Sequence, residues 1–324
     1  MNRAPEKLVI GVDLGGTHTA AGLVDGRLEL LASVEQKTVK SSQEALLESI
    51  VAAIRKLLRK TSAPVAAAGF GIPSMIDQLH GRAVMSVNIP LAGIDFVAYM
   101  KEKLGLPVFI DNDANVAALA ELRAGAARGA KQALMITVGT GIGGGIVIDG
   151  EIYRGATGSA AELGHIVIDV NGPPCQGACP NNGCFETMAS GTALIRYAEE
   201  EAAAHPGSAL GGALAAGKTL DGALVSGLAA KGDQPALEVM EKIGFYIGVG
   251  VTSLVNVFNP EIFVLGGGIM EAGDLIIKPA LEYLRERGLK PNRDIVKVVK
   301  PRFGPEAGMI GAACLALDNI ERST

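Results

Sequence analysis

The chain has 324 residues, of which 48% are hydrophobic and 19% are charged, a composition typical of a soluble protein with room for two domains. Its formal net charge of -5 excludes the basic surface that nucleic-acid binding requires and argues against attachment to an acidic membrane. No apolar run reaches the roughly 20 residues that span a bilayer, and the segment before Leu8 lacks the apolar region of a signal peptide. We therefore expect a cytoplasmic protein with reduced thiols, in which clustered cysteines are better explained as metal ligands than as disulfides.

Two glycine-rich turns, each between two strands, are the first candidates for a functional site. The sequence predicts strands over 8–12 and 20–24 around DLGGTHT, and strands over 133–138 and 146–149 around GTGIGGG. Backbone N–H groups in such turns bind anions, and the missing Cβ atoms let phosphate oxygens approach. Neither turn has the Walker or the dinucleotide-binding pattern, and one such turn alone is more often structural. A pair of them beside Asp13 favours a phosphate site, with Asp13 orienting Mg²⁺.

The elements between and after these turns predict a duplicated α/β architecture with a cleft between its halves. Apolar residues at helical spacing predict a helix over 41–60, started by a capping box of Ser41 and Glu44. The other predicted elements are buried strands over 65–72, 107–110 and 261–265, short helices within 208–231, and helices over 235–258, 274–287 and 305–319.

The segment DNDAN, residues 111–115, follows a predicted strand and opens a helix rich in Ala and Leu. Asp and Asn at a helix start are equally well explained as plain caps. The functional interpretation makes Asp113 a general base that takes a proton from an attacking hydroxyl, and Asn112 a contact to that substrate. Polar groups at the carboxyl end of a strand favour this interpretation, because open α/β sheets bind ligands there.

Three of the four cysteines fall within one loop rich in Gly, Pro and Asn. Cys175, Cys179 and Cys184 follow His165, and together they supply the ligands of a closed tetrahedral Zn²⁺ site. The alternative is an incidental cluster of thiols, which a loop of this composition makes less favourable. Such a zinc is structural, because no ligand position is left open. Cys314 lies in an apolar helix and is expected in a core.

Taken together, these motifs resemble the ROK family of sugar kinases and repressors, and within it the bacterial ATP-dependent glucokinases, over nearly the whole chain. The motifs are DLGGTHT, DNDANVAALAE, GTGIGGGIV, ELGHIVID with the cysteine loop, VLGGGIM and PEAGMIGAA. The resemblance implies an α/β fold of the actin-like ATPase (ribonuclease H-like) type with two domains and a cleft between them. The small domain is expected over 1–113, completed by a helix at about 302–324, and the large domain with the zinc loop over 114–301.

The resemblance also implies a role for each matching position. Asp113 is the base for the sugar 6-hydroxyl. The sugar-binding residues are expected to be Asn88, Asn112, Asp113, Glu162, His165 and Glu186. The residues expected to hold ATP and its Mg²⁺ are Asp13, Gly15, Gly16, Thr17, Gly139, Thr140, Gly141, Gly266, Gly267 and Gly268. The zinc ligands are expected to be His165, Cys175, Cys179 and Cys184.

The chain departs from the family pattern at three places, one of which is the absence of the usual Trp after the NLP-like segment. Three residues, not one, separate Cys175 from Cys179, and Ser74 replaces the second glycine of a GxPG turn, which bears on sugar specificity. The leading hypothesis is a homodimeric or higher homo-oligomeric glucokinase. The alternatives are a kinase for fructose, mannose or N-acetylmannosamine and a sugar-responsive repressor. Polyphosphate in place of ATP is an alternative phosphoryl donor. The repressor requires a DNA-reading helix-turn-helix, for which a first strand at Leu8 leaves no room.

Overall fold

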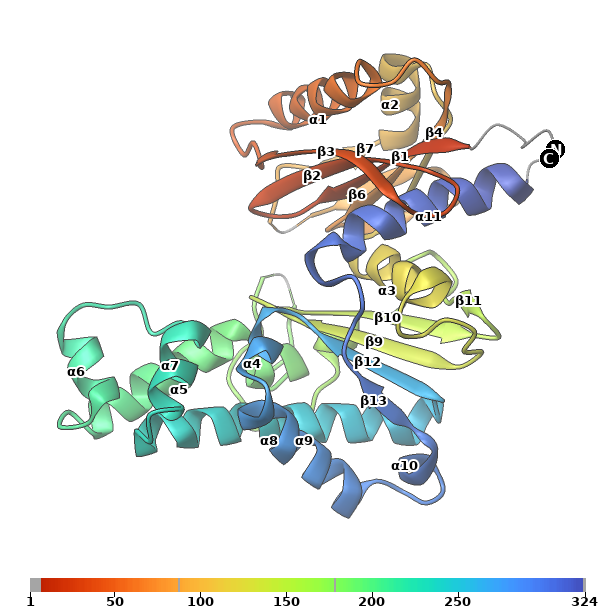
Figure 1. Cartoon of the computed structure of the whole chain (residues 1–324). Helices are drawn as coiled ribbons and strands as arrows, with labels where there is room; N and C mark the ends of the chain where they lie inside the picture. The colour runs from red at the N-terminus through yellow and green to blue at the C-terminus, as the bar shows by residue number, and fades with distance from the viewer. Residues whose placement is uncertain (1–6, 87, 178, 323–324) are drawn as a thin grey trace. The chain divides into compact units, whose positions relative to one another are not determined.

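The computed structural model describes residues 7–86, 88–177 and 179–322, and the chain divides into two compact units (Figure 1). Unit 1 consists of Met1–Lys131, Gly145–Ala161 and Pro301–Thr324, and unit 2 of Gln132–Gly144 and Glu162–Lys300. The expectation of no signal segment before Leu8 concerns mainly residues 1–6, which lie outside the described residues. The domain boundary that we expect at residue 113 stays a prediction. No helix in the described part of the chain is both long and apolar enough to cross a membrane.

Unit 1 is built on a five-stranded sheet in the order β3-β2-β1-β4-β8. The strands β1 (Leu8–Leu14), β2 (His18–Val24) and β3 (Leu30–Lys37) are antiparallel, and β4 (Val65–Ile72) and β8 (Val108–Asn112) continue the sheet parallel to β1. β1 is almost wholly buried, whereas β3 alternates between partly buried and exposed residues, as an edge strand does. In the register Asp13 pairs with Gly71, and Gly71 pairs with Asp111. The two aspartates therefore lie in one row near the carboxyl edge of the parallel strands.

Helices cover both faces of this sheet (Figure 1). The helices α1 (Gln43–Leu58) and α2 (Phe96–Leu104) pack on one face, and α11 (Ala307–Arg322), with α3 (Asp113–Ala124) against it, packs on the other. The predicted capping box is wrong by one residue: Ser42 is the N-cap, because its Oγ accepts the Ala45 N–H at 3.1 Å. Ser41 and Ser42 carry the same hydroxyl, and the sequence does not distinguish between them.

A small antiparallel sheet of β5 (Met75–Asp77), β6 (Arg82–Met85) and β7 (Ala92–Ile94) extends unit 1. Ile76 and Ala83 bury their side chains in the same core as the large sheet and α1. The Ser74 hydroxyl, which is buried, donates to the Met85 carbonyl at 2.9 Å. Ser74 therefore fixes the turn between β4 and β5 to its neighbouring strand.

The second five-stranded sheet has the order β11-β10-β9-β12-β13. Its strands are β9 (Ala133–Val138), β10 (Ile142–Ile148), β11 (Glu151–Ile152), β12 (Ile262–Gly266) and β13 (Lys297–Val299). The predicted strand start at residue 146 is wrong, because β10 begins at Ile142 and includes Gly143, Gly144 and Gly145. The prediction counted these glycines as turn, whereas a strand accepts glycine where a neighbour packs closely, as Ala118 does against Gly145.

The helices of unit 2 pack mostly around α8 (Gln234–Phe258), the long helix expected from the sequence. The others are α4 (Phe185–Ala189), α5 (Gly191–Ala204), α6 (Ala209–Ala215), α7 (Gly222–Ala229), α9 (Asp274–Arg287) and α10 (Asn292–Ile295). Short 3₁₀ turns cover Leu163–His165, Gly268–Ala272 and, in unit 1, Gly304–Glu306. Cys314 of α11 is 2% exposed, which confirms its placement in a core.

Candidate active site and metal centre

Asp13 lies near the end of β1, with Gly308 at the start of α11 against its carboxylate. A Cβ at residue 308 would overlap that carboxylate, so the glycine allows the helix to approach it. Burial, and to a lesser degree the nearby Asp113 carboxylate, raises the pKa of Asp13 to about 7. Two acids that each resist ionisation lie close together in unit 1, an arrangement that functional sites favour and stable cores avoid.

The first glycine-rich turn is held by Thr38 of the segment after β3. The Thr38 hydroxyl donates to the Gly15 carbonyl at 2.7 Å, and the Thr38 N–H donates to the Thr17 carbonyl at 2.9 Å. Gly16 lies against the Asn88 side chain, and Asn88 and Thr17 are exposed. Fixing the carbonyls on one side keeps the turn in shape while its exposed residues remain accessible to a ligand.

The turn between β8 and α3 carries Asn112 and Asp113. Asn112 is the N-cap of α3, since its Oδ1 accepts the N–H groups of Ala114 at 2.9 Å and Asn115 at 3.3 Å. Asn112 is therefore a helix cap through this oxygen, and the two hydrogen bonds also fix the orientation of its side-chain amide. Burial raises the pKa of Asp113, and the Ala114 N–H partly offsets that rise. Asp113 is thus partly desolvated at the positive end of α3.

Two further acids, one before α3 and one within it, are buried, and sequence reasoning assigned neither of them a role. Asp111 is 1% exposed and forms an ion pair with Arg154, whose Nη2 lies 2.7 Å from its Oδ2. Glu121 is 0% exposed, and its carboxylate accepts the backbone N–H groups of Ala126 and, in the segment before α11, of Arg302 and Phe303. A buried carboxylate requires such donors. Most of these partners are distant in sequence. Only the acids themselves, within DNDANVAALAE, were visible to sequence reasoning.

In unit 2 the second glycine-rich turn is bound to Glu186 and to the start of α5. The Ile142 N–H donates to Glu186 Oε2 at 2.7 Å. The Thr192 hydroxyl donates to the Thr140 carbonyl at 2.9 Å, and the Gly191 N–H donates to the Gly139 carbonyl at 2.7 Å. The predicted sugar residue Glu186 and the predicted phosphate turn with Gly141 are therefore neighbours.

The third glycine cluster, Gly266–Gly268, lies beside the same turn. Gly267 has φ +99°, and a Cβ there would overlap the backbone of Val138, the residue before Gly139. Only glycine combines that φ with so close an approach. Unit 2 therefore brings the second and third glycine clusters together, as a shared nucleotide site requires.

The four predicted metal ligands, His165, Cys175, Cys179 and Cys184, lie together in unit 2, with one ligand atom from each within 4.8 Å of all the others. The His165 Nδ1 and Cys175 Sγ atoms are 3.5 Å apart, and the Sγ atoms of Cys179 and Cys184 are 3.8 Å apart. In a tetrahedral site with Zn–S bonds of about 2.3 Å, sulfur atoms lie roughly 3.8 Å apart. The long spacing between Cys175 and Cys179 therefore does not prevent Cys175 from joining the other three candidate ligands. The intervening Ala178 lies outside the described residues.

The chemistry of these thiols fits a bound cation. Burial, together with the neighbouring Cys175 and Cys179, raises the pKa of the Cys184 thiol to about 12. Three clustered thiolates repel one another, and a divalent cation removes the penalty by coordinating all of them. Nδ1 of His165 lies 3.5 Å from Cys175 Sγ, and a cation bound at this nitrogen would leave Nε2 as the N–H donor of the ring.

The remaining predicted residue of this region, Glu162, is exposed and precedes the 3₁₀ turn that carries His165, whose N–H donates to the Glu162 carbonyl at 3.0 Å. Each unit thus gathers its own set of predicted residues. Unit 1 holds Asp13, Gly15, Gly16, Thr17, Asn88, Asn112 and Asp113, and unit 2 holds Gly139, Thr140, Gly141, Glu162, His165, Glu186, the Gly266–Gly268 cluster and the cysteines.

The model of the ROK family matches residues 9–319 of this chain. The chain belongs to the ROK family. It is 36% identical to the glucokinase of Halalkalibacterium halodurans over 96% of this chain and 95% of that protein. It is 33% identical to the glucokinase of Thermotoga maritima over 98% and 99%. The xylose repressor of Bacillus subtilis is more distant, at 27% identity, with 77% of its length covered.

Solved structures agree with this assignment. A ROK family glucokinase from Streptomyces griseus, in complex with glucose and AMPPNP, is 34% identical and has a TM-score of 0.83 over 96% of this chain and 99% of that one. A ROK hexokinase from Thermus thermophilus, also 34% identical, has a TM-score of 0.79 over 97% and 99%. The predicted fold class, an actin-like ATPase fold with two domains, is confirmed by these matches.

Proposed function

We propose that this protein is an ATP-dependent glucokinase, which transfers the γ-phosphoryl group of ATP to the 6-hydroxyl of glucose. The observation that carries the proposal is its likeness to glucokinases at 33–36% identity over nearly the full length of both chains. The xylose repressors of two Bacillus species are less similar, at 27% identity, and 77% of their length is covered by the match. The two desolvated acids in unit 1 and the glycine turns of both units supply the groups that this chemistry requires.

In this proposal Asp113 accepts the proton of the sugar hydroxyl as that oxygen attacks phosphorus. Burial raises the pKa of Asp113 towards the range in which a carboxylate is an effective base near neutral pH. Its position at the N-terminus of α3, behind the cap made by Asn112, fixes its direction. The amide Nδ2 of Asn112 then donates to a sugar hydroxyl, since the cap uses only its Oδ1.

The glycine turns contribute backbone N–H groups to the phosphates, with Thr17 and Thr140 adding hydroxyl donors. Asp13 would hold Mg²⁺ directly or through water. Bound Mg²⁺ neutralises charge that develops on the phosphate oxygens. Gly266–Gly268 would lie near the adenosine. A cation near Asp13 favours its ionised form, because the charge offsets the burial that raises its pKa to about 7.

The further residues proposed to bind the sugar are Glu162, His165 and Glu186 of unit 2 and Asn88 of unit 1. Bound Zn²⁺ supplies a rigid anchor for the loop and fixes the tautomer of His165. Nε2–H of His165 is then a permanent donor to a sugar hydroxyl. Glu186 accepts the Ile142 N–H through Oε2, which connects sugar recognition to the second phosphate turn. We further propose a homodimer in the cytoplasm, where reduced thiols suit the zinc site.

The test is a turnover panel of glucose, fructose, mannose and N-acetylmannosamine, each with ATP and with polyphosphate. Glucose with ATP is expected to give the highest kcat/KM. A higher value for another hexose would transfer the proposal to that sugar, and no turnover of any pair would refute a kinase.

The role of Asp113 is tested by Asp113→Asn, which is expected to lose phosphoryl transfer by a factor of about 10² to 10⁴ while still binding glucose. The matched control is Asp95→Asn at the N-cap of α2, where Asn is an equally good cap and activity should stay normal. Normal turnover in Asp113→Asn would remove this residue as the base.

A further inference from the structure

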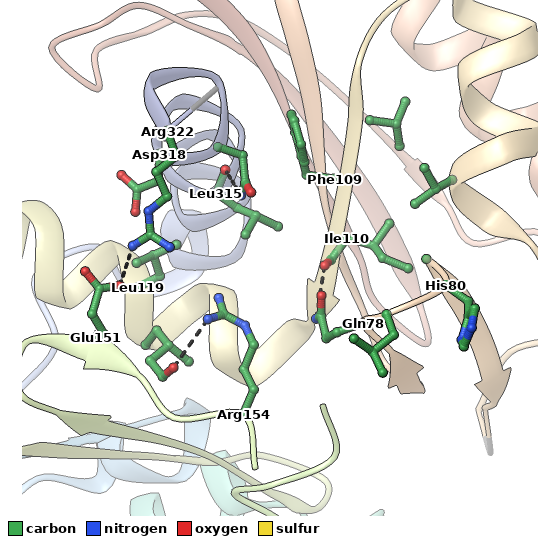
Figure 2. A pocket seen from close by; sticks show the side chains of 16 residues that line it. Gln78, His80, Phe109, Ile110, Leu119, Glu151, Arg154, Leu315, Asp318 and Arg322 are labelled. Carbon is green, nitrogen blue, oxygen red and sulfur yellow. Dashed lines mark hydrogen bonds and ion pairs between the residues drawn. The ribbon is translucent and has the colours of Figure 1, made fainter. Parts of the chain in front are cut away.

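Unit 1 contains a cavity of about 480 Å³ beside β8, α3, β11 and α11 (Figure 2). Apolar side chains such as Leu119 and Leu315 form part of its wall, and Glu151 and Arg322 form an ion pair at 2.7 Å. Arg154 also lines the cavity, and its guanidinium continues inward to Asp111. A side chain that follows β11 thus reaches from a space that small molecules can enter to the turn between β8 and α3.

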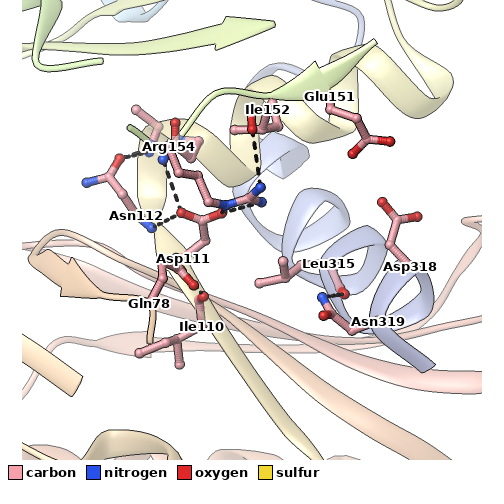
Figure 3. Close-up of polar contacts among 12 residues, drawn as sticks. Gln78, Ile110, Asp111, Asn112, Glu151, Ile152, Arg154, Leu315, Asp318 and Asn319 are labelled. Carbon is pink, nitrogen blue, oxygen red and sulfur yellow. Dashed lines mark hydrogen bonds and ion pairs between the residues drawn. The ribbon is translucent and has the colours of Figure 1, made fainter. Parts of the chain in front are cut away.

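The Asp111 carboxylate is saturated with N–H donors (Figure 3). Its Oδ1 accepts the Asn112 N–H at 2.8 Å and Nδ2 of Asn115 at 3.0 Å. Its Oδ2 accepts Nε and Nη2 of Arg154, both at 2.7 Å. Nη1 of Arg154 also donates to the Ile152 carbonyl at 3.3 Å, which fixes the guanidinium plane.

These contacts tie Arg154 to the orientation of Asn112 and Asp113. Asp111 immediately precedes both residues. Its Oδ1 accepts the backbone N–H of Asn112 and the side-chain Nδ2 of Asn115, so it holds the chain on either side of the cap. With Asp111 1% exposed, water cannot easily replace the guanidinium. A carboxylate left there without its cation must reorganise its surroundings, and the turn that it holds is the nearest part free to move.

We propose that Arg154 is a positioning residue for phosphoryl transfer, which acts through the buried Asp111 carboxylate to hold Asn112 and Asp113 in their productive orientation. This inference rests on the proposed function for its kinetic part and on the hydrogen-bond network for its structural part. Arg154 would touch neither sugar nor nucleotide. A displacement of about 1 Å at a reacting group can cost on the order of 10² in rate.

Arg123 provides a matched control in the same unit. Its side chain is 29% exposed, against 28% for Arg154, and it also binds an aspartate through Nε and Nη2, in this case Asp318. Asp318 lies near the end of α11, away from the β8–α3 turn. A loss of stability from removing an arginine ion pair is therefore common to both variants, whereas a loss of positioning belongs to Arg154 alone.

The kinetic experiment compares Arg154→Gln, Arg154→Lys and Arg123→Gln in the full chain. Arg154→Gln is expected to lower kcat roughly 10- to 100-fold with the KM for ATP unchanged, because only the turn is displaced. Arg154→Lys should fall between it and the wild type, since an ammonium replaces the charge but not the two-donor geometry. Arg123→Gln should keep the wild-type kcat. A normal kcat in Arg154→Gln, or an equal loss in both glutamine variants, would overturn the proposal.

The cavity allows a second test by chemical rescue. In Arg154→Ala the space of the side chain opens into the cavity, so methylguanidinium can bind beside Asp111 and should recover part of the lost kcat. Ethylammonium, a cation without the planar pair of donors, should recover less. Equal recovery with both cations, or none with methylguanidinium, would show that the guanidinium geometry does not act on the turn.

A third measurement does not depend on activity. Hydrogen exchange of the backbone amides of Asn112, Ala114 and Asn115 should be faster in Arg154→Gln than in Arg123→Gln, since their acceptors belong to the network. Unchanged exchange would refute the structural part. A wild-type chain that turns over no hexose would refute the proposed function, yet faster exchange in Arg154→Gln would still show that Arg154 holds the turn.

Discussion

Asp13 should make the ligand-free protein less stable as the pH rises, and Asp13→Asn should remove that dependence. Burial and the nearby Asp113 raise the pKa of Asp13 from 3.8 to about 7 in the folded protein. Its stabilising contribution is therefore fully present below pH 3.8 and is lost as the pH rises towards 7, since the unfolded chain releases the proton first. At about 1.4 kcal/mol for each tenfold change in proton affinity, this loss amounts to about 4 kcal/mol. Water that reaches the half-buried carboxylate makes this an upper value.

The assay is the free energy of unfolding in urea, followed by circular dichroism without ligands at several values between pH 5 and pH 8. The advantage of Asp13→Asn over the wild type should grow across this range and level off above pH 7. Mg²⁺ with ATP should stabilise the wild type more than the variant, which keeps the glycine turns but lacks the carboxylate for the cation. Asp77→Asn is the control, because the His80 hydrogen bond lowers the pKa of Asp77 below 3.8. Its contribution is lost only at more acidic pH, so the effect of Asp77→Asn should stay constant between pH 5 and pH 8. An advantage of Asp13→Asn that is independent of pH would refute the reasoning.

Two further predictions concern unit 2. Elemental analysis should find about one zinc per chain. Cys179→Ser should lose the zinc and raise the KM for glucose, whereas the control Cys314→Ala should keep it. Active wild-type protein without zinc would refute the metal site. Gly267→Ala should destabilise the protein by about 1 to 3 kcal/mol and raise the KM for ATP, because φ is +99° there and the methyl group would overlap Val138. The neighbouring Gly268→Ala, where a Cβ meets open space, should be nearly neutral, and equal effects of the two substitutions would contradict the account.

The sequence predicted most of the secondary structure because each element carries its own local signal. The strand expected over 65–72 is β4, Val65–Ile72, and the helix expected at 274–287 is α9, Asp274–Arg287. Errors arose where the local signal was ambiguous, as for the adjacent residues Ser41 and Ser42, or misleading, as for the glycines that continue β10. Local chemistry also sufficed to predict that His165, Cys175, Cys179 and Cys184 lie together, since three thiols and an imidazole so close in sequence have few other uses.

The supports of the candidate site were not predictable in the same way. Arg154 meets Asp111 across 43 residues, and the segment before α11 meets Glu121 across 181. The sequence near each acid does not predict its partner, because the fold brings the two together. A buried carboxylate is costly, so each of these acids must find donors, but only the structure shows which ones.

The turn after β8 carries two aspartates two residues apart, and the structure gives them opposite tasks. Asp111 is enclosed with a guanidinium and further N–H donors, so both of its oxygens are occupied in holding the turn. Asp113 is desolvated beside Asp13 with weaker compensation, so its pKa is raised and its affinity for a proton increases. A base for an alcohol must be able to take up a proton, whereas the group that positions it must keep its hydrogen-bond donors in place. Placing Arg154 beside the first carboxylate and not the second therefore separates these roles within a single turn, and it explains why a residue outside the substrate site should affect kcat.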